Sequence, residues 1–287
     1  TPRACAIMRR MSLSITTDYA ADTGNPEPYL RQIAEAGFSH IHWCHHWNTD
    51  FLYLPPEIDQ IERWLRAFGL QVLDTHASDG REKRWASPLE YERLAGVELV
   101  KNRIDFTAAL GGDAIVMHIP DQNERVNDPP IWDQLRRSLD AIEPCAQSRR
   151  IRIAIENTGN AGGNYENIAA LLAAYRPDYL GLCYDCGHGA LHGRGLDQLE
   201  AMKDRLVAVH LHDNDGLGDL HRLPFTGVVD WPRLAGIMAR SSYAKCVSME
   251  SNIHREATQD ERDFLARAFA AGSRLSEMIE AARGRTE

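Results

Sequence analysis

The chain has 287 residues, of which 44% are hydrophobic and 25% charged, and this ordinary globular composition suits one large barrel or two small domains. A formal net charge of -9 at pH 7 disfavours a nucleic-acid partner. No window holds the roughly eighteen uninterrupted apolar residues of a membrane span. The short apolar stretch near the start is broken by Arg9 and Arg10, so it resembles a first strand more than a signal peptide, and we expect a cytoplasmic protein.

Strand-like and helix-like segments alternate along the chain, which indicates an α/β fold with a parallel sheet. We predict strands near residues 5–15, 38–44, 70–75, 113–118, 151–156, 180–185, 206–212 and 245–250. We predict helices over residues 28–36, 57–68, 88–110, 131–147, 165–175, 196–203, 231–240 and 258–282.

Eight strands are enough to close a barrel, so we expect a single (β/α)8 TIM barrel as one domain over residues 1–287. A doubly wound open sheet is the alternative. Such a sheet usually has a Gly-rich phosphate turn after its first strand, and residues 16–19, Thr-Thr-Asp-Tyr, do not form one.

The six cysteines do not form the pattern of a structural zinc site. Only Cys183 and Cys186 have Cys-x-x-Cys spacing, and there is no second pair to complete a zinc ribbon. We predict reduced, packed thiols.

Five apolar runs each end on a residue that can ligate a metal ion. These residues are His118, Glu156, Asp185, His210 and Glu250. The carboxyl ends of all the strands of a barrel surround one mouth, so these side chains are expected to converge. Three acids at one mouth repel one another unless a cation lies between them. The sequence therefore predicts a metal centre.

Several of these residues also have structural interpretations. Asp185 could cap the following helix, with His188 as its partner, instead of binding an ion. Glu156 follows a buried run and needs a cation, which Arg222 or Lys245 could supply in place of a metal.

His210 and His212 share a face by the two-residue period of a strand, so one could ligate the ion while the other contacts substrate. In the following loop, Asp219 and His221 form either a second metal site or a lid that faces water.

Other histidines and aromatic residues end the second, third and fourth predicted strands. His76 and His118 could line a substrate pocket or hold an additional ion. Trp43 and Trp47 lie in a stretch of unusual aromatic density, and a ring at the rim stacks well on the apolar face of a sugar. We expect one of the two tryptophans to pack between barrel and helix instead.

Taken together, these motifs resemble the xylose isomerase-like superfamily of barrels, which includes sugar isomerases and epimerases, inosose dehydratases and the endonuclease IV family. The resemblance covers about residues 74 to 250, and its ordered motifs are His76-Ala-Ser, His118-Ile-Pro, Ile155-Glu-Asn-Thr, Asp185-Cys-Gly-His, Val209-His-Leu-His-Asp-Asn-Asp-Gly, Asp219-Leu-His, Gly227-Val-Val-Asp-Trp and Met249-Glu-Ser.

Resemblance to the tagatose and psicose epimerases implies one divalent ion, Mn²⁺ first, with Co²⁺, Mg²⁺ or Zn²⁺ as alternatives. It implies the ligands Glu156, Asp185, His210 and Glu250, with the two glutamates as general acid and base. The substrate would be a keto-sugar or polyol. Its binding residues would be His76, His118, His188, His212, His221, Arg222 and Trp47. The chain is compatible with a homo-oligomer.

The rival resemblance is to endonuclease IV, a phosphodiesterase whose three-zinc cluster uses nine ligands. Every one has a counterpart here: His76, His118, Glu156, Asp185, His188, His210, Asp219, His221 and Glu250. Against this function, the DNA-inserting residues of that family are replaced by Ala77-Ser78-Asp79, whose acid repels phosphate.

Two further functions remain. A dehydratase or lyase needs the same ion and the same proton abstraction, whereas a sugar sensor without chemistry would be expected to have lost ligands. We predict a metal-dependent sugar isomerase or epimerase that binds about one equivalent of a divalent ion.

Overall fold

Eight parallel strands form one continuous sheet in a computed structural model that describes residues 11–119, 129–160, 163–191 and 193–285. The strand order is β7-β6-β5-β4-β3-β2-β1-β8, so sequence neighbours are also neighbours in space. The strands are β1 Leu13–Thr16, β2 His40–Trp43, β3 Gln71–His76, β4 Ala114–His118, β5 Arg152–Glu156, β6 Leu180–Asp185, β7 Leu206–His210 and β8 Val247–Met249.

The ring closes between the two end strands of this order. The backbone N–H of Leu211 donates to the carbonyl of Ser248 at 3.1 Å, and the N–H of Glu250 donates to the carbonyl of Leu211 at 3.2 Å. These bonds pair the chain just after β7 with the end of β8. The predicted (β/α)8 barrel is confirmed.

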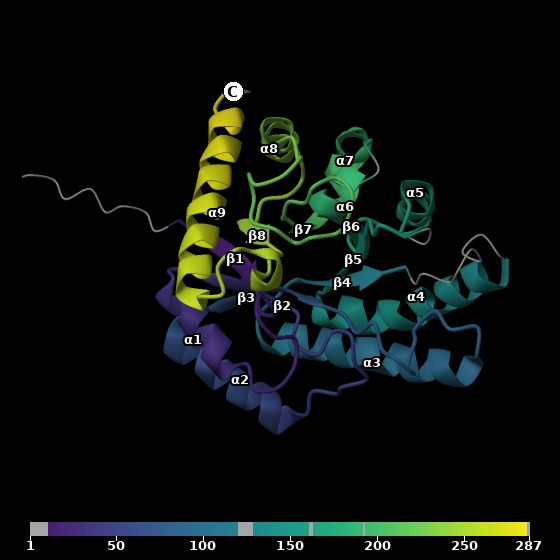
Figure 1. Cartoon of the computed structure of the whole chain (residues 1–287). Coiled ribbons are helices and arrows are strands. Elements are labelled where there is room, and N and C mark those ends of the chain that lie inside the picture. The colour runs from purple at the N-terminus through teal and green to yellow at the C-terminus, as the bar shows by residue number, and fades with distance from the viewer. Residues whose placement is uncertain (1–10, 120–128, 161–162, 192, 286–287) are drawn as a thin grey trace, which may run out of the picture.

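Helices cover the outside of the ring (Figure 1). They are α1 Glu27–Glu35, α2 Pro55–Phe68, α3 Glu90–Ala109, α4 Pro129–Arg149, α5 Tyr165–Ala174, α6 Cys186–Leu191, α7 Gly195–Met202, α8 Trp231–Ala239 and α9 Glu261–Arg283, with short 3-10 turns η1 Lys203–Arg205 and η2 Ile253–Arg255. No helix in the described ranges has the length and apolar character needed to cross a membrane.

Most predicted boundaries agree with the structure to within about three residues. In the described residues the first strand begins at Leu13, and residues 5–10 of the predicted strand lie outside the described chain. Helix α9 begins at Glu261 because the Asp260 side chain accepts a hydrogen bond from the N–H of Asp263. The short helix α6 was not predicted, since six residues carry no helical periodicity.

The inside of the barrel is lined by unusually small apolar side chains. One inner cluster consists of Ala114, Val116, Ala154, Cys183, Val207 and Ala208, whereas alternate residues of the same strands, such as Ile115 and Ile153, belong to the large core between sheet and helices. Small inward side chains leave room for polar groups to be buried along the barrel axis.

A buried charge network uses this room. The ammonium group of Lys245, just before β8, lies 3.1 Å from Asp74 and 2.7 Å from Asp113. The other oxygen of Asp74 lies 2.7 Å from Nδ1 of His42 on β2. Burial alone would raise the pKa of Asp74, but Lys245 and His42 outweigh burial and lower it. Asp74 is therefore a carboxylate inside the barrel.

We predict that Lys245→Met lowers the free energy of unfolding by about 3–5 kcal/mol, because it leaves the buried Asp74 carboxylate without its cation. Urea titration measures the change. Adding Asp74→Asn to this variant should recover part of the loss.

A matched control is Arg149→Met, which breaks the pair between Arg149 and Asp105, whose side chains are 55% and 47% exposed. That change should cost no more than about 1 kcal/mol. Equal losses in the two variants would contradict the stabilising role of the Lys245 pair.

Candidate metal centre

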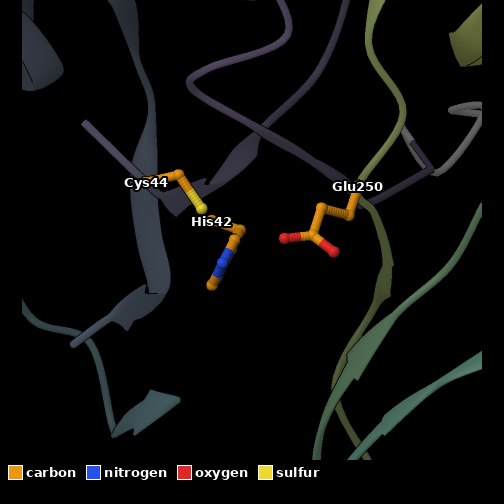
Figure 2. A group of neighbouring side chains, drawn as sticks. All are labelled: His42, Cys44 and Glu250. Carbon is orange, nitrogen blue, oxygen red and sulfur yellow. The ribbon is translucent and has the colours of Figure 1, made fainter. Parts of the chain in front are cut away.

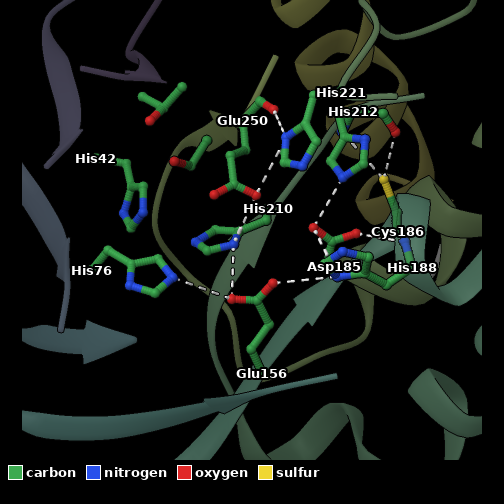
Figure 3. A network of polar contacts seen from close by, with 12 residues as sticks. His42, His76, Glu156, Asp185, Cys186, His188, His210, His212, His221 and Glu250 are labelled. Atoms are coloured by element: carbon green, nitrogen blue, oxygen red, sulfur yellow. Dashed lines mark hydrogen bonds and ion pairs between the residues drawn. The ribbon is translucent and has the colours of Figure 1, made fainter. Parts of the chain in front are cut away.

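The ends of six consecutive strands supply the chemistry-bearing side chains. His76, His118, Glu156, Asp185 and His210 are the last residues of β3 to β7, and Glu250 directly follows β8. Strand register places His118 beside Glu156 and Asp185 beside His210. The predicted convergence of Glu156, Asp185, His210 and Glu250 is seen directly (Figure 3).

His210 lies at the centre of the cluster. Its Nδ1 atom is 3.1 Å from Oε2 of Glu156 and 3.1 Å from Oε2 of Glu250. Neither contact has hydrogen-bond geometry, and both ring nitrogens of this 1% exposed residue lack a hydrogen-bond partner in the described chain. The three atoms thus face one small space without forming hydrogen bonds to one another, which is the arrangement expected of ligand atoms around a cation.

The two oxygens of Asp185 have different neighbours, which confirms the interpretation as a helix cap and leaves ion binding as a prediction. Its Oδ1 accepts the backbone N–H of His188 at 2.7 Å, which caps α6. Its Oδ2 lies 3.0 Å from Nε2 of His212 and 3.5 Å from Nδ1 of His188. Because the same Nδ1 atom lies 3.4 Å from Oε1 of Glu156, His188 links the two carboxylates.

Electrostatics explain why this cluster needs a cation. Burial alone would raise the pKa of Glu156, but His210 and His118 lower it well below its usual value. Burial is likewise outweighed at Glu250, whose pKa is lowered by His210 and His221. Burial lowers the pKa of His210, yet Cys183 and the two glutamates raise it strongly overall. In the absence of an ion, a proton on His210 balances the carboxylates.

A divalent ion supplies the same compensation and frees the imidazole as a neutral ligand. Two glutamates, an aspartate and a histidine form a mixed oxygen and nitrogen donor set that suits Mn²⁺, Co²⁺, Fe²⁺ or Zn²⁺. The residues present therefore fit a metal.

A second group of ligand atoms lies on β3, β4 and β5. Nε2 of His118 is 3.1 Å from Oε2 of Glu156 and 3.2 Å from Nε2 of His76. The ring of Trp47 covers this group, with its centroid 4.5 Å from that of His76 and 5.6 Å from that of His118. Trp47 is thus the tryptophan that faces the site, whereas Trp43 is buried in the core between barrel and helices.

A third group includes the loop after β7. Oδ2 of Asp219 lies 3.1 Å from Nε2 of His188 and 3.1 Å from Nε2 of His221. Burial lowers the pKa of His221, but the hydrogen bond that its ring donates to Asp219 and the charge of Glu250 raise it to about 10. Its ring stacks on His212 with centroids 4.2 Å apart. Asp219 and His221 therefore contact the site, although the Asp219 side chain is also 37% exposed to solvent.

Two candidate counter-charges for Glu156 lie elsewhere. Lys245 is paired with Asp74 and Asp113 inside the barrel. Arg222 forms backbone bonds to Asp213 in both directions at 2.9 Å, and in the part of the chain that the structure describes its guanidinium makes no hydrogen bond or ion pair. Neither cation reaches Glu156, whose neighbours are histidines.

Asp18, His42 and Cys44 were missed by sequence reasoning. Burial, Asp18 and Glu250 together raise the pKa of the Cys44 thiol well above its usual value. Burial and then Glu250 raise the pKa of Asp18, against a hydrogen bond from Thr16 that lowers it. The period-two alternation of a strand from His40 could have indicated that His42 and Cys44 point inward.

The comparisons with known proteins agree with this fold. A family model described as a xylose isomerase-like TIM barrel matches residues 30–268, and the chain belongs to this family. An uncharacterised protein of Sinorhizobium fredii, y4fM, is 34% identical over 281 residues, which cover 89% of this chain and 90% of the relative.

Solved structures with the same fold are more distant in sequence. A D-tagatose 3-epimerase-like protein has 20% identity and a TM-score of 0.76, covering 96% of this chain and 100% of that one. An L-ribulose 3-epimerase has 17% identity and a TM-score of 0.75, with 96% and 97% covered. The IOLI protein with a bound zinc atom has 14% identity and a TM-score of 0.71, with 95% and 99% covered.

We predict that Gly187→Ala weakens metal binding about 10- to 100-fold, the range for a displaced partner of a metal ligand. A Cβ atom at Gly187 would lie 2.0 Å from Cε1 of His212, so the ring must move away from Asp185. Competition against a chelator measures the affinity.

Gly159→Ala is the matched control, because its Cβ would lie 3.8 Å from Leu191 and 3.9 Å from His188, at ordinary contact distance. This variant should bind metal like the wild type. Unchanged affinity in Gly187→Ala would show that the His212 contact does not support the site.

Proposed function

We propose that the protein is a divalent-metal-dependent isomerase or epimerase of keto-sugars. The observation that carries the proposal is the pair of buried glutamates, Glu156 and Glu250, which approach the same imidazole nitrogen of His210 at 3.1 Å. A reaction that removes a proton from a carbon and returns one needs two such groups around one substrate. Similarity of fold to a D-tagatose 3-epimerase-like protein and an L-ribulose 3-epimerase supports the proposal.

The ion would be held by Glu156, Asp185, His210 and Glu250, with Mn²⁺ as the first expectation and Co²⁺, Mg²⁺ or Zn²⁺ as alternatives. When bound, it polarises a substrate carbonyl and an adjacent hydroxyl, which acidifies the C–H bond between them. The similar IOLI structure has a bound zinc atom, which supports the proposal of a metal in this fold.

Glu156 and Glu250 are carboxylates at neutral pH, because their histidine neighbours lower the pKa of both groups. One glutamate, as a carboxylate, would remove the proton from the carbon, and the other, after taking up a proton from solvent, would return one to the substrate. Return to the opposite face inverts the centre, which is epimerisation, and return to the neighbouring carbon gives an aldose–ketose isomerisation. The orientation of the sugar decides between these outcomes.

The remaining side chains orient the substrate. His188 is held between Asp219 and the backbone carbonyl of Asn157, so its ring direction is fixed before a sugar binds. We expect Nε2 of His188 and Nε2 of His221 to donate to substrate oxygens in exchange for the hydrogen bonds that both atoms make to Asp219. The wall of the pocket would be completed by His76, His118, His212, Arg222 and Trp47.

We predict that Glu156→Gln and Glu250→Gln each lower kcat by about 10²- to 10⁴-fold, because an amide cannot accept the proton. Epimerisation and solvent-deuterium incorporation into a ketose measure the effect, and circular dichroism confirms the fold. Glu143→Gln, at a distant pair with Arg176, should keep full activity. Full activity in either site variant would remove that glutamate from proton transfer.

A three-metal phosphodiesterase is the second candidate. It is favoured by the two additional ligand groups, His76–His118–Glu156 and His188–Asp219–His221, whose ligand atoms lie within 4.8 Å of one another in each group. A dehydratase or lyase acting on a keto-sugar or keto-inositol would use the central group alone.

Three assays on the metal-loaded protein separate these functions. We expect deuterium exchange into a ketose, no cleavage of an abasic-site oligonucleotide, and no loss of water from a keto-inositol. His118→Ala and His221→Ala each remove one ligand of an additional group. They should leave exchange measurable if the central group acts alone. Oligonucleotide cleavage that both variants abolish would instead establish the phosphodiesterase.

A further inference from the structure

A fourth group of ligand atoms lies beside the central cluster, and two of its three residues, His42 and Cys44, have no part in the proposed reaction. It consists of His42, Cys44 and Glu250, whose ligand atoms lie within 4.8 Å of one another. Figure 2 shows the imidazole, the thiol and the carboxylate pointing toward a common space. His42 and Cys44 are 0% and 1% exposed, so this space is closed to bulk water.

The hydrogen bonds of His42 prepare it as a ligand. Its Nδ1 lies 2.7 Å from the Asp74 carboxylate, which Lys245 keeps charged, so Nδ1 carries the proton and donates it. Nε2 then has a free lone pair. This buried nitrogen has no hydrogen-bond partner in the described residues, which is unfavourable unless a cation or a donor meets it. A histidine that donates its other N–H to a carboxylate is the usual arrangement at metal sites.

Cys44 is fixed and lies in a negative environment. Its backbone N–H donates to Oγ1 of Thr17 at 2.9 Å, which holds the residue just past the end of β2. The carboxylates of Asp18 and Glu250 are both close enough to the thiol to act on its charge. A divalent ion would be attracted to this environment and would displace the thiol proton on binding.

We propose that Nε2 of His42, Sγ of Cys44 and the carboxylate of Glu250 form a separate subsite for a thiophilic divalent cation such as Zn²⁺ or Co²⁺. Glu250 has two oxygens, so it can bridge this subsite and the central group. Thiolate and imidazole ligands favour Zn²⁺ and Co²⁺, whereas Mg²⁺ and Mn²⁺ prefer all-oxygen surroundings. An ion in the subsite would also bind Glu250, so occupancy of the subsite would compete with proton transfer by that residue.

Titration of the chelator-treated full chain with Co²⁺ tests the subsite without any turnover. Wild type should develop a thiolate-to-cobalt charge-transfer absorption in the near ultraviolet. Cys44→Ser should abolish this absorption, and His42→Gln should weaken the corresponding Co²⁺ binding at least about tenfold, by the effect of losing one ligand. Mg²⁺ in excess should not displace the absorbing ion.

Two other buried thiols provide matched controls. Cys183 belongs to a ligand group with Glu156 and His210, and Cys186 donates to the backbone carbonyl of His212 at 3.0 Å. Cys183→Ser and Cys186→Ser should keep the absorption. Its absence from wild type, or its loss in Cys183→Ser with retention in Cys44→Ser, would overturn the proposal.

X-ray absorption of the zinc-loaded protein gives a second measurement that needs no Cys44 variant to fold. A sulfur neighbour at about 2.3 Å from zinc is expected in wild type and in Cys183→Ser, and its absence in either would overturn the subsite. An inactive protein that shows the Cys44-dependent signal would refute only the proposed isomerase. An active protein without the signal would refute only the subsite.

Discussion

Mutual repulsion among buried carboxylates is the constraint on which this site depends. Glu156 and Asp185 end the neighbouring strands β5 and β6, Glu250 follows β8 of the same ring, and each is at most slightly exposed. In a medium of low polarity, such charges are tolerable only with cations between them. The nearby lysine and arginine do not reach Glu156, so imidazoles compensate its charge, and under the proposed function a bound ion would do the same.

Inside the barrel, below the site, charged and polar side chains again pair with groups of opposite charge. Lys245 enters from the start of β8, Asp74 lies against it, and His42 connects Asp74 to the level of His210, with ring centroids of the two histidines 4.5 Å apart. Small inward side chains such as Ala154 make this possible, because bulky residues would fill the axis. A column of polar side chains therefore replaces part of the apolar core of the barrel. The same column fixes the orientation of the His42 ring beside the candidate metal ligands.

Sequence periodicity predicted the barrel and the convergence of Glu156, Asp185, His210 and Glu250, because parallel strands must present their ends at one mouth. It could not assign the two oxygens of Asp185 to a cap and to the site, since both roles use the same motif. The role of Lys245 was hidden for a different reason. It precedes its strand, and its partner Asp74 lies 171 residues away, so only the closed ring brings the two together.

The presence of these nine candidate ligands does not by itself determine the reaction, because the same side chains can bind one ion or several. The residues around the ligands distinguish better between the candidate substrates. Trp47 lays an apolar ring 4.5 Å from His76, a surface that suits the C–H face of a sugar. Asp79 lies close enough to His118 to raise its pKa, and this negative charge opposes a phosphate group approaching the same wall. Both features act on the pair His76 and His118, and under the proposed function both would favour a neutral, hydroxyl-rich substrate.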